Sequence, residues 1–312
     1  MKIPVLSSKD LLTVMSLSRK EIISLFDFAA KLKKAQKSGK PHRLLEGKTL
    51  AMIFEKTSTR TRVSFEIGMY QLGGYALFLS HNDIQIGRGE TISDTARVLS
   101  RYADGIMIRT FSHDKVIELA RNADIPVING LSDLFHPCQA LSDLFTIYER
   151  EPGFAGRKLA YVGDGNNVAH SLMLCSAMLG MDIAVATPKN YQPDREVVSM
   201  AFRLCAESGS HVTVTTDIKM AVENADYLYT DVWTSMGQER EAEKRRRVFR
   251  DYKITRALLS KCADGCRVMH CLPAHRGEEI EDEVLDSDVA IVFDQAENRL
   301  HVQKALLCAL MG

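Results

Sequence analysis

The chain has 312 residues, with 40 basic and 40 acidic side chains, so its formal net charge is zero. This balance provides no bulk electrostatic attraction for nucleic acid or for an anionic membrane surface. The length suggests two domains, and 46% apolar with 26% charged residues is typical of a soluble globular protein. No apolar run approaches the roughly 20 residues needed to span a bilayer.

The N-terminal segment and the cysteine content indicate a cytoplasmic protein. Residues 1–8 are followed at once by Lys9 and Asp10, which leaves no apolar core for a signal peptide. The seven cysteines are an odd number and lie in apolar segments, as Cys175 and Cys308 do. This distribution is typical of reduced core thiols and not of a disulfide framework.

Strand and helix patterns alternate through the first half of the chain, after two helices predicted within residues 8–39. Apolar runs of strand length occur at residues 49–54, 75–80, 105–109 and 126–129. Apolar side chains at helical spacing follow them at about 62–72, 91–102, 113–122 and 138–149. This alternation predicts a parallel sheet that is covered by helices and joined by right-handed crossovers.

A break at Glu151-Pro152-Gly153 predicts a domain boundary. In the second alternating series, strands are expected at residues 158–162, 183–186, 211–214, 227–230, 267–270 and 289–293. A final helix is expected from about residue 297 to 311. The predicted fold is therefore α/β, with a first domain of residues 1–150, a second of residues 151–296, and a C-terminal helix of about 297–312 that packs back on the first domain.

A charge run occupies residues 238–250 of the second domain. Because its signs are mixed, it predicts a solvated helix or a mobile loop and not a nucleic-acid patch.

The stretch Ser58–Arg62 lies where the first predicted strand is followed by a helix. The first turn of a helix has unpaired backbone N–H groups and the positive end of the helix dipole, so it favours an anion. Hydroxyls add neutral donors, and guanidinium groups match phosphate oxygens. A capped helix with two solvated arginines is the plain alternative. However, two arginines and three hydroxyls within five residues favour an oxyanion site, most simply for phosphate.

Ligands of parallel α/β sheets bind beyond the carboxyl ends of the strands, so residues that follow the strands are candidate contacts. In the first domain these are a polar loop at residues 82–90, Arg109 at the end of the third strand, and His136 before Pro137. A histidine in such a position is usually only a helix cap. Here it shares a sheet edge with arginines, which predicts a ligand contact.

The second domain begins with a glycine-containing turn, Gly163–Asn167, that could indicate a dinucleotide. Against this, Val168-Ala169 occupies the third glycine position, and no acidic residue follows strand 183–186 to hold a ribose. Two consecutive asparagines instead suit a small carboxylate and an amine.

Two more strands of this domain end in reactive side chains, Asp231 and Cys271. Cysteines and histidines between residues 262 and 275 could suggest zinc. However, Cys266 and Cys271 lie at opposite ends of a strand, roughly 16 Å apart at about 3.3 Å per residue, so one metal cannot be bound by both. Cys271 is predicted to face the cleft between the domains, with a buried structural cysteine as the alternative.

Together these stretches resemble the aspartate/ornithine carbamoyltransferase family over essentially the whole chain. Its two carbamoyl-phosphate motifs are similar to Ser58-Thr59-Arg60-Thr61-Arg62 and His136-Pro137-Cys138-Gln139. The motifs of its ornithine branch are similar to Asp231-Val232-Trp233-Thr234-Ser235-Met236-Gly237 and His270-Cys271-Leu272-Pro273. The resemblance implies transfer of a carbamoyl group from carbamoyl phosphate to the δ-amine of L-ornithine, a step of arginine metabolism.

The resemblance also implies site residues. It assigns carbamoyl phosphate to Ser58, Thr59, Arg60, Thr61, Gln85, Arg109, His136, Gln139, Cys271, Leu272 and Arg299. It assigns ornithine to Asn167, Asp231, Ser235 and Met236, and catalysis to Arg109, His136, Asp231 and Cys271. Because family members are trimers with shared sites, Gln85 would come from a neighbouring subunit of a homotrimer. Arg299 would close the site from the last helix, and the two domains would close on binding.

The implied reaction requires no metal and no organic cofactor. A substrate amine with a pKa near 10.4 must lose a proton, and either Asp231 or Cys271 can favour or accept it. Putrescine or an acylated ornithine remains an alternative substrate, although putrescine lacks the carboxylate that Asn167 would bind. Aspartate would call for cations where the chain has Asp231. A non-enzymatic metabolite-binding protein is a further alternative, which the intact set of catalytic residues argues against.

Overall fold

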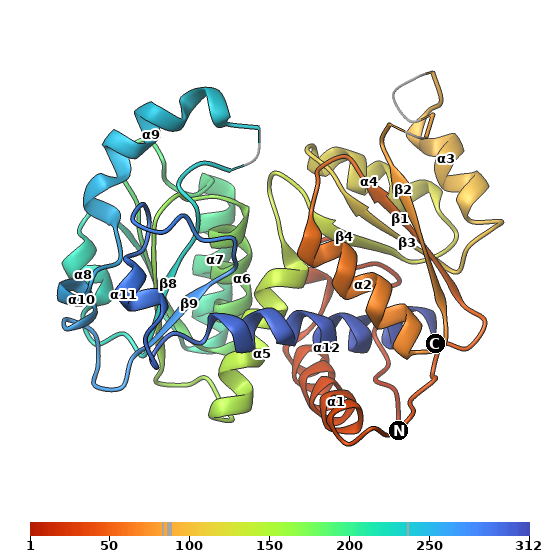
Figure 1. Ribbon diagram of the computed structural model, residues 1–312, viewed down its shortest axis with the longest axis horizontal. Coiled ribbons are helices and arrows are strands. Elements are labelled where there is room, and N and C mark those ends of the chain that lie inside the picture. Colours follow the sequence, from red (N-terminus) through yellow and green to blue (C-terminus); the bar gives the residue numbers. More distant parts are fainter. Residues whose placement is uncertain (83, 86–88, 236) are drawn as a thin grey trace. The chain divides into compact units, whose positions relative to one another are not determined.

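The computed structural model describes residues 1–82, 84–85, 89–235 and 237–312. The chain divides into two compact units (Figure 1), the first made of Met1–Glu149 with Glu297–Gly312 and the second of Arg150–Ala296. Each unit contains one parallel sheet flanked by helices, which confirms the predicted fold class. Among the described residues, no helix is long and apolar enough to cross a membrane.

The sheet of the first unit has four parallel strands in the order β2-β1-β3-β4. The strands are β1 (Thr49–Phe54), β2 (Tyr75–Ser80), β3 (Gly105–Arg109) and β4 (Val127–Leu131). The chain passes from β1 to β2 on one side and then returns to place β3 on the other side of β1. The strand order therefore reverses between β1 and β3, and ligands of such sheets bind at the carboxyl ends of the strands beside the reversal.

The helices of the first unit connect these strands. They are α1 (Arg19–Lys37), α2 (Thr59–Gln71), α3 (Ile92–Leu99), α4 (His113–Asn122) and α5 (Pro137–Arg150). Of the two helices predicted within residues 8–39, the first is only a 3₁₀ turn, η1 (Val14–Ser16). The hydroxyls of Thr13 and Ser16 accept hydrogen bonds from backbone N–H groups at its start, and Leu17 then returns to an extended conformation.

The C-terminal helix α12 (Val292–Met311) contributes its residues from Glu297 onward to the first unit, as predicted. This part buries polar as well as apolar side chains. The Lys304 ammonium is fully buried and donates to Gln36 Oε1 at 2.7 Å and Gln71 Oε1 at 2.8 Å, with His42 Nε2 at 3.1 Å. Because these acceptors belong to α1, α2 and the segment between α1 and β1, Lys304 ties the helix to three parts of the unit.

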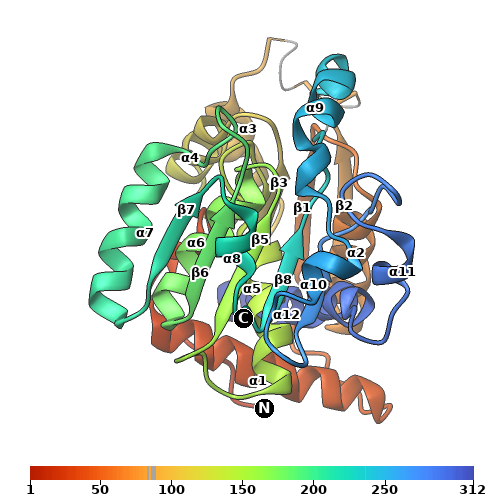
Figure 2. The same cartoon turned by 90° about the vertical axis from the view of Figure 1, so that its left-hand side faces the viewer.

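The second unit has a five-stranded parallel sheet in the order β7-β6-β5-β8-β9, which Figure 2 shows with β7 at one edge. The strands are β5 (Lys158–Val162), β6 (Asp182–Ala186), β7 (Val212–Thr215), β8 (Tyr227–Thr230) and β9 (Arg267–His270). The strand order reverses between β5 and β8, so the residues after these two strands lie where a ligand is expected.

Six helices and two 3₁₀ turns are described in this unit. They are α6 (Asn167–Leu179), α7 (Arg195–Ser208), α8 (Ile218–Val222), α9 (Ala242–Phe249), α10 (Arg256–Leu259) and α11 (Asp282–Leu285), with 3₁₀ turns η2 (Glu239–Glu241) and η3 (Arg250–Tyr252). The two longest of these helices, α6 and α7, precede β8.

The strand predicted at residues 289–293 is wrong. A single bridge joins Ala290 to Val268 of β9, and α12 then begins, earlier than the sequence predicted. The backbone N–H of His270 at the end of β9 donates to the side chain of Gln295 at 3.0 Å. A side chain of α12 thus takes the hydrogen bond that a further strand residue would have accepted, so no longer strand is required.

Candidate active site

The first group of candidate residues lies at the carboxyl ends of β1 and β3. Phe54 at the end of β1 pairs in register with Arg109 at the end of β3, and Arg109 is buried. Four residues after Phe54, Ser58 caps α2, since its hydroxyl accepts a hydrogen bond from the N–H of Thr61 at 3.2 Å. The predicted phosphate site therefore combines the first turn of α2, which follows β1, with Arg109 at the end of the neighbouring strand β3.

The two arginines of the Ser58–Arg62 stretch differ in their surroundings. Arg62 donates to Glu66 at 3.0 Å and its guanidinium lies 3.8 Å from the centroid of the Phe78 ring. Arg60 is half-buried in the first turn of α2, and no described side chain is paired with it. Of the two, Arg60 is therefore the one that remains available for an anion. Residue type and spacing alone do not distinguish the two arginines, although the resemblance to the family assigns only Arg60.

Arg299 of α12 connects two other predicted residues in the same unit. It is buried, and it donates to Thr61 Oγ1 at 2.9 Å and to Gln139 Oε1 at 3.0 Å. Gln139 in turn donates to Asp143 Oδ1 at 2.8 Å, a residue that the sequence analysis missed. This chain of hydrogen bonds fixes the Gln139 amide and keeps one charged guanidinium beside the first turn of α2.

His136 precedes the first residue of α5 and is buried. Burial lowers the pKa of His136 well below its usual value, and the positive charges of Arg299 and Arg109 lower it further. The imidazole is therefore neutral at physiological pH. A neutral imidazole can donate one hydrogen bond to a carbonyl oxygen without carrying a charge that would repel the arginines.

Gln85 is not brought to this group. It is exposed, and no hydrogen bond or ion pair links its side chain to any described residue. Much of the polar loop at residues 82–90 lies outside the described residues.

The second group lies at the carboxyl ends of β5 and β8. Asn166 caps α6 through its side-chain oxygen, which accepts from the N–H groups of Val168 and Ala169 at 2.9 and 3.2 Å. The turn before it packs closely on another loop, because a Cβ at Gly165 would lie 2.3 Å from the backbone nitrogen of Pro193. Glycine is therefore required here for packing, which accounts for a feature that could suggest a dinucleotide.

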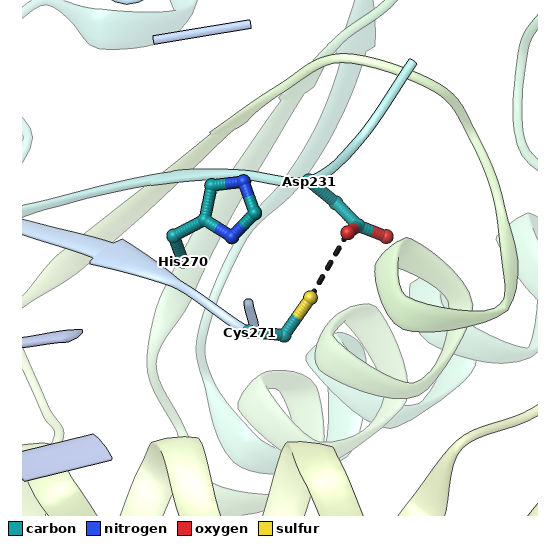
Figure 3. Close-up of side chains that lie close together, drawn as sticks. All are labelled: Asp231, His270 and Cys271. Carbon is teal, nitrogen blue, oxygen red and sulfur yellow. Dashed lines mark hydrogen bonds between the residues drawn. The ribbon is translucent and has the colours of Figure 1, made fainter. Parts of the chain in front are cut away.

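Asp231, directly after β8, is the centre of this group (Figure 3). Its carboxylate is buried and accepts from Cys271 Sγ at 2.9 Å, from Asn166 Nδ2 at 2.8 Å and from the N–H of Val232 at 2.8 Å. Cys271 directly follows β9, the neighbour of β8. The structure therefore brings Asp231 and Cys271 together, as the sequence predicted. It also brings Asn166 to Asp231, a contact that the sequence did not predict.

Ligand atoms of Asp231, His270 and Cys271 lie within 4.8 Å of one another, as in a metal site (Figure 3). However, Nδ1 of His270 accepts from the N–H of Leu272 at 2.8 Å, and its Nε2 bonds Glu279 Oε1 at 3.1 Å. Both ring nitrogens are therefore already used, which favours a positioning role for His270.

Leu272 has a backbone φ of +57°, a region that branched side chains rarely adopt. Such a conformation costs on the order of 1–3 kcal/mol and occurs preferentially at functional sites. The peptide bond from Leu272 to Pro273 is cis. The strained residue coincides with one of the predicted substrate contacts.

Two further predicted contacts, Asn167 and Ser235, lie in the same unit. Asn167 is half-buried as the first residue of α6, and the N–H of Ser235 donates to Gln238 Oε1 at 3.1 Å. Met236 lies outside the described residues.

The charge run at residues 238–250 contains a buried residue that the sequence analysis missed. Arg245 of α9 is only 3% exposed, forms an ion pair with Asp164 and donates to the carbonyl oxygen of Trp233. Burial raises the pKa of Asp164 to about 6, against the opposing effect of the Arg245 charge. The position of Asp164 after β5 was the one available signal, but nothing in three consecutive arginines distinguishes Arg245 from its neighbours.

Two family models match nearly the whole chain. Residues 9–149 match the carbamoyl-P binding domain of aspartate/ornithine carbamoyltransferase, and residues 155–310 match its Asp/Orn binding domain. The chain belongs to the aspartate/ornithine carbamoyltransferase family. The family that the four motifs predicted is thereby confirmed.

Several members of this family are similar to the chain over nearly their full length. The ornithine carbamoyltransferase of Thermococcus kodakarensis is 55% identical over 307 residues, which cover 98% of each chain. That of Bacillus thuringiensis subsp. konkukian is 57% identical over 309 residues, covering 99% of this chain and 96% of the relative. The solved ornithine carbamoyltransferase of Pyrococcus furiosus aligns with a TM-score of 0.96 at 54% identity, covering 100% of this chain and 99% of the other.

Proposed function

We propose that this carbamoyltransferase transfers the carbamoyl group of carbamoyl phosphate to the δ-amine of L-ornithine, giving L-citrulline and phosphate. The main support is the buried carboxylate of Asp231, which is held by Cys271 and Asn166 at the carboxyl edge of the second sheet. A carboxylate suits a substrate with ammonium groups and would repel the second carboxylate of aspartate. The similarity to relatives named ornithine carbamoyltransferase supports the same substrate.

In the first unit, we assign carbamoyl phosphate to the region around the start of α2. The phosphate would bind the N–H groups of the first turn with Ser58, Thr59, Arg60, Thr61 and Arg109. The neutral imidazole of His136, with Arg109, would polarise the carbamoyl carbonyl, and Gln139 would hold its amino group. Charged and neutral donors placed in advance stabilise both the developing oxyanion and the departing phosphate.

In the second unit, the amine of ornithine would be held and deprotonated at Asp231. In the structure the Cys271 thiol donates a hydrogen bond to Asp231 Oδ1. We infer that Asp231 is the direct partner of the ammonium group and that Cys271 positions the carboxylate and assists proton removal. Asn167 and Ser235 would hold the α-carboxylate and α-amine.

A substrate panel tests this proposal. Product formation from carbamoyl phosphate is measured with ornithine, aspartate, putrescine and N-acetylornithine, with Asp231→Asn as the control variant. We expect kcat/KM for ornithine to exceed the values for the other amines by at least about 10³-fold. A substrate that lacks one of ornithine's polar groups would leave buried polar groups of the site unpaired, which strongly disfavours it. Preference for putrescine or the acylated amine would replace ornithine by a related substrate, and absence of turnover with all four would favour a binding protein.

We also propose a homotrimer. Apolar side chains are exposed on one helix and one strand of the first unit: Val63, Ile67 and Tyr70 on α2, and Tyr75 and Leu77 on β2. β2 is an edge strand of its sheet. Exposed apolar side chains beside an open sheet edge are typical of surfaces that other chains cover. The trimeric state itself is an inference from the resemblance to the family.

We place the enzyme in the cytoplasm. All seven cysteines are free thiols, and five of them are buried. Reduced thiols are typical of proteins from a reducing compartment.

A further inference from the structure

The loop after β9 holds a second group of metal-binding side chains. His275, Glu278 and Glu279 each offer one ligand atom, and these atoms lie within 4.8 Å of one another. The loop is closed by two backbone hydrogen bonds, from the N–H of Glu278 to His275 O at 2.9 Å and from the N–H of Gly277 to Ile280 O at 2.9 Å. Three potential ligands therefore come from five consecutive residues of a single folded loop.

Glu279 is the unusual member of the group because its carboxylate is completely buried and only half satisfied. Oε1 accepts from the N–H of His275 at 2.6 Å and bonds His270 Nε2 at 3.1 Å. Oε2 is buried too, and no donor among the described residues reaches it. Burying a carboxylate oxygen without a partner is unfavourable, and a bound cation would satisfy it.

We propose that His275, Glu278 and Glu279 bind a divalent transition-metal cation. The ligands are an imidazole nitrogen of His275, a carboxylate oxygen of Glu278 and Oε2 of Glu279. A set of one imidazole and two carboxylates suits Zn²⁺, Co²⁺ or Mn²⁺, whereas Ca²⁺ is bound by oxygen ligands only. Three protein ligands leave the remaining coordination positions for water.

The other ligands are available at little cost. His275 is exposed, and no described residue hydrogen-bonds to its ring. Glu278 pairs with Arg246 at 2.9 Å, but the Arg246 side chain is 56% exposed, and exposed ion pairs are weak. In contrast, both ring nitrogens of His270 are already bonded, so a cation at Asp231, His270 and Cys271 would have to displace one of these bonds. Of the two groups, the loop with His275, Glu278 and Glu279 is therefore the better site for a cation.

The proposed site is connected to the candidate active site through Glu279. The same carboxylate that would bind the cation by Oε2 holds His270 by Oε1, and His270 precedes Cys271. The cation would fix this carboxylate and stabilise the fold of the loop without occupying a substrate contact.

Titration with Co²⁺ tests the site in the full-length protein. All variants are made in a Cys271→Ala background, called the parent, because this substitution removes cation binding at Asp231, His270 and Cys271. We expect one Co²⁺ per chain, an absorption spectrum of nitrogen and oxygen ligands without a thiolate charge-transfer band, and a rise in Tm on binding. In His275→Ala, the affinity should fall at least tenfold and the rise in Tm should disappear, whereas His211→Ala, which removes an exposed histidine elsewhere in the unit, should match the parent.

Glu278→Gln gives a second test should His275→Ala fail to fold, with the same weakening expected. Unchanged binding in either folded variant would overturn the proposal. A thiolate band or the absence of binding by the parent would overturn it equally, because the cation would then be held by cysteines or not at all.

Discussion

The hydrogen bond between the Cys271 thiol and Asp231 leads to a prediction about proton removal. Cys271→Ala should lower kcat and raise KM for ornithine, reducing kcat/KM by about 10²-fold, the lower limit for loss of acid–base assistance. Binding of carbamoyl phosphate should change little. The wild-type rate should rise between about pH 6 and 10, because an amine with a pKa of about 10.4 becomes neutral in that direction.

The measurement is kcat/KM for ornithine across this range, for wild type, Cys271→Ala and Asp231→Asn. If Cys271→Ala matched wild type at every pH, the thiol would be a packed core cysteine without a role in the reaction.

Arg60 and Arg62 form a matched pair two residues apart on α2. Arg60→Gly should reduce kcat by about 10²–10³-fold with the fold intact, because it removes a donor to the transferring group. Arg62→Ala should leave kcat nearly unchanged, since Arg62 contacts Glu66 and Phe78 instead. Steady-state kinetics of both variants at saturating ornithine distinguish the two roles. Equal losses would mean that both guanidinium groups bind phosphate.

Within α12, the buried Lys304 predicts a pH dependence of stability. Burial lowers the pKa of Lys304 to about 8 from its ordinary 10.5, and its neighbours Gln36, Gln71 and His42 supply no carboxylate. Between these pH values the unfolded chain binds more protons than the folded one, so stability rises with pH. The contribution is fully present above about pH 10.5 and is lost as the pH falls through 8.

Lys304→Met removes this titration. The free energy of unfolding of wild type, relative to Lys304→Met, should therefore rise by up to about 3 kcal/mol between pH 7 and 10. Urea unfolding at several pH values measures the difference, and His301→Ala in the same helix is the control, because burial lowers the pKa of His301 to about 4, outside this range. A pH-independent difference would show that Lys304 keeps its ordinary pKa in the folded protein.

At the scale of elements, the sequence predicted most strands because buried parallel strands are short apolar runs between turn residues. β1, β2, β3, β5, β8 and β9 have the predicted bounds. The segment after Val289 was mispredicted as a strand because Val289–Phe293 has the same apolar pattern. In the structure Gln295 of α12 bonds the backbone of β9, a tertiary contact that no local pattern reveals.

The candidate site was predictable to the extent that its residues follow strands. Asp231 and Cys271 meet because β8 and β9 are neighbours, and the alternation of elements indicates that such ends share an edge. The roles of Glu279 and Arg245 could not be predicted, since each depends on a side chain from a segment distant in sequence or from a loop. Periodicity contains no information about such contacts.

For the whole assembly, the proposed homotrimer with shared sites predicts complementation between subunits. Gln85→Ala and Asp231→Asn should each be strongly impaired alone. After random exchange of equal amounts, one site in each mixed trimer, or roughly a quarter of all sites, would combine an intact Gln85 with an intact Asp231. Activity should therefore reappear on mixing, as measured by citrulline formation after exchange verified by native mass spectrometry.

Mixing either variant with itself is the control, and it should give no recovery. Recovery that is absent in verified mixed trimers would mean that Gln85 does not act across a subunit boundary.

The pairing of Arg245 with Asp164 has a consequence for how the charge run tolerates genetic variation. Arg245, Arg246 and Arg247 appear equivalent in the sequence, but Arg246 and Arg247 have exposed side chains with weak ion pairs. Removing Arg245 would leave the buried carboxylate of Asp164 without its counter-ion, one of the few ways a single substitution destabilises severely. A saturation library over these codons should therefore be permissive at two positions and restrictive at the first. Even lysine should be selected against there, since it cannot reproduce the simultaneous bonds to Asp164 and the Trp233 carbonyl.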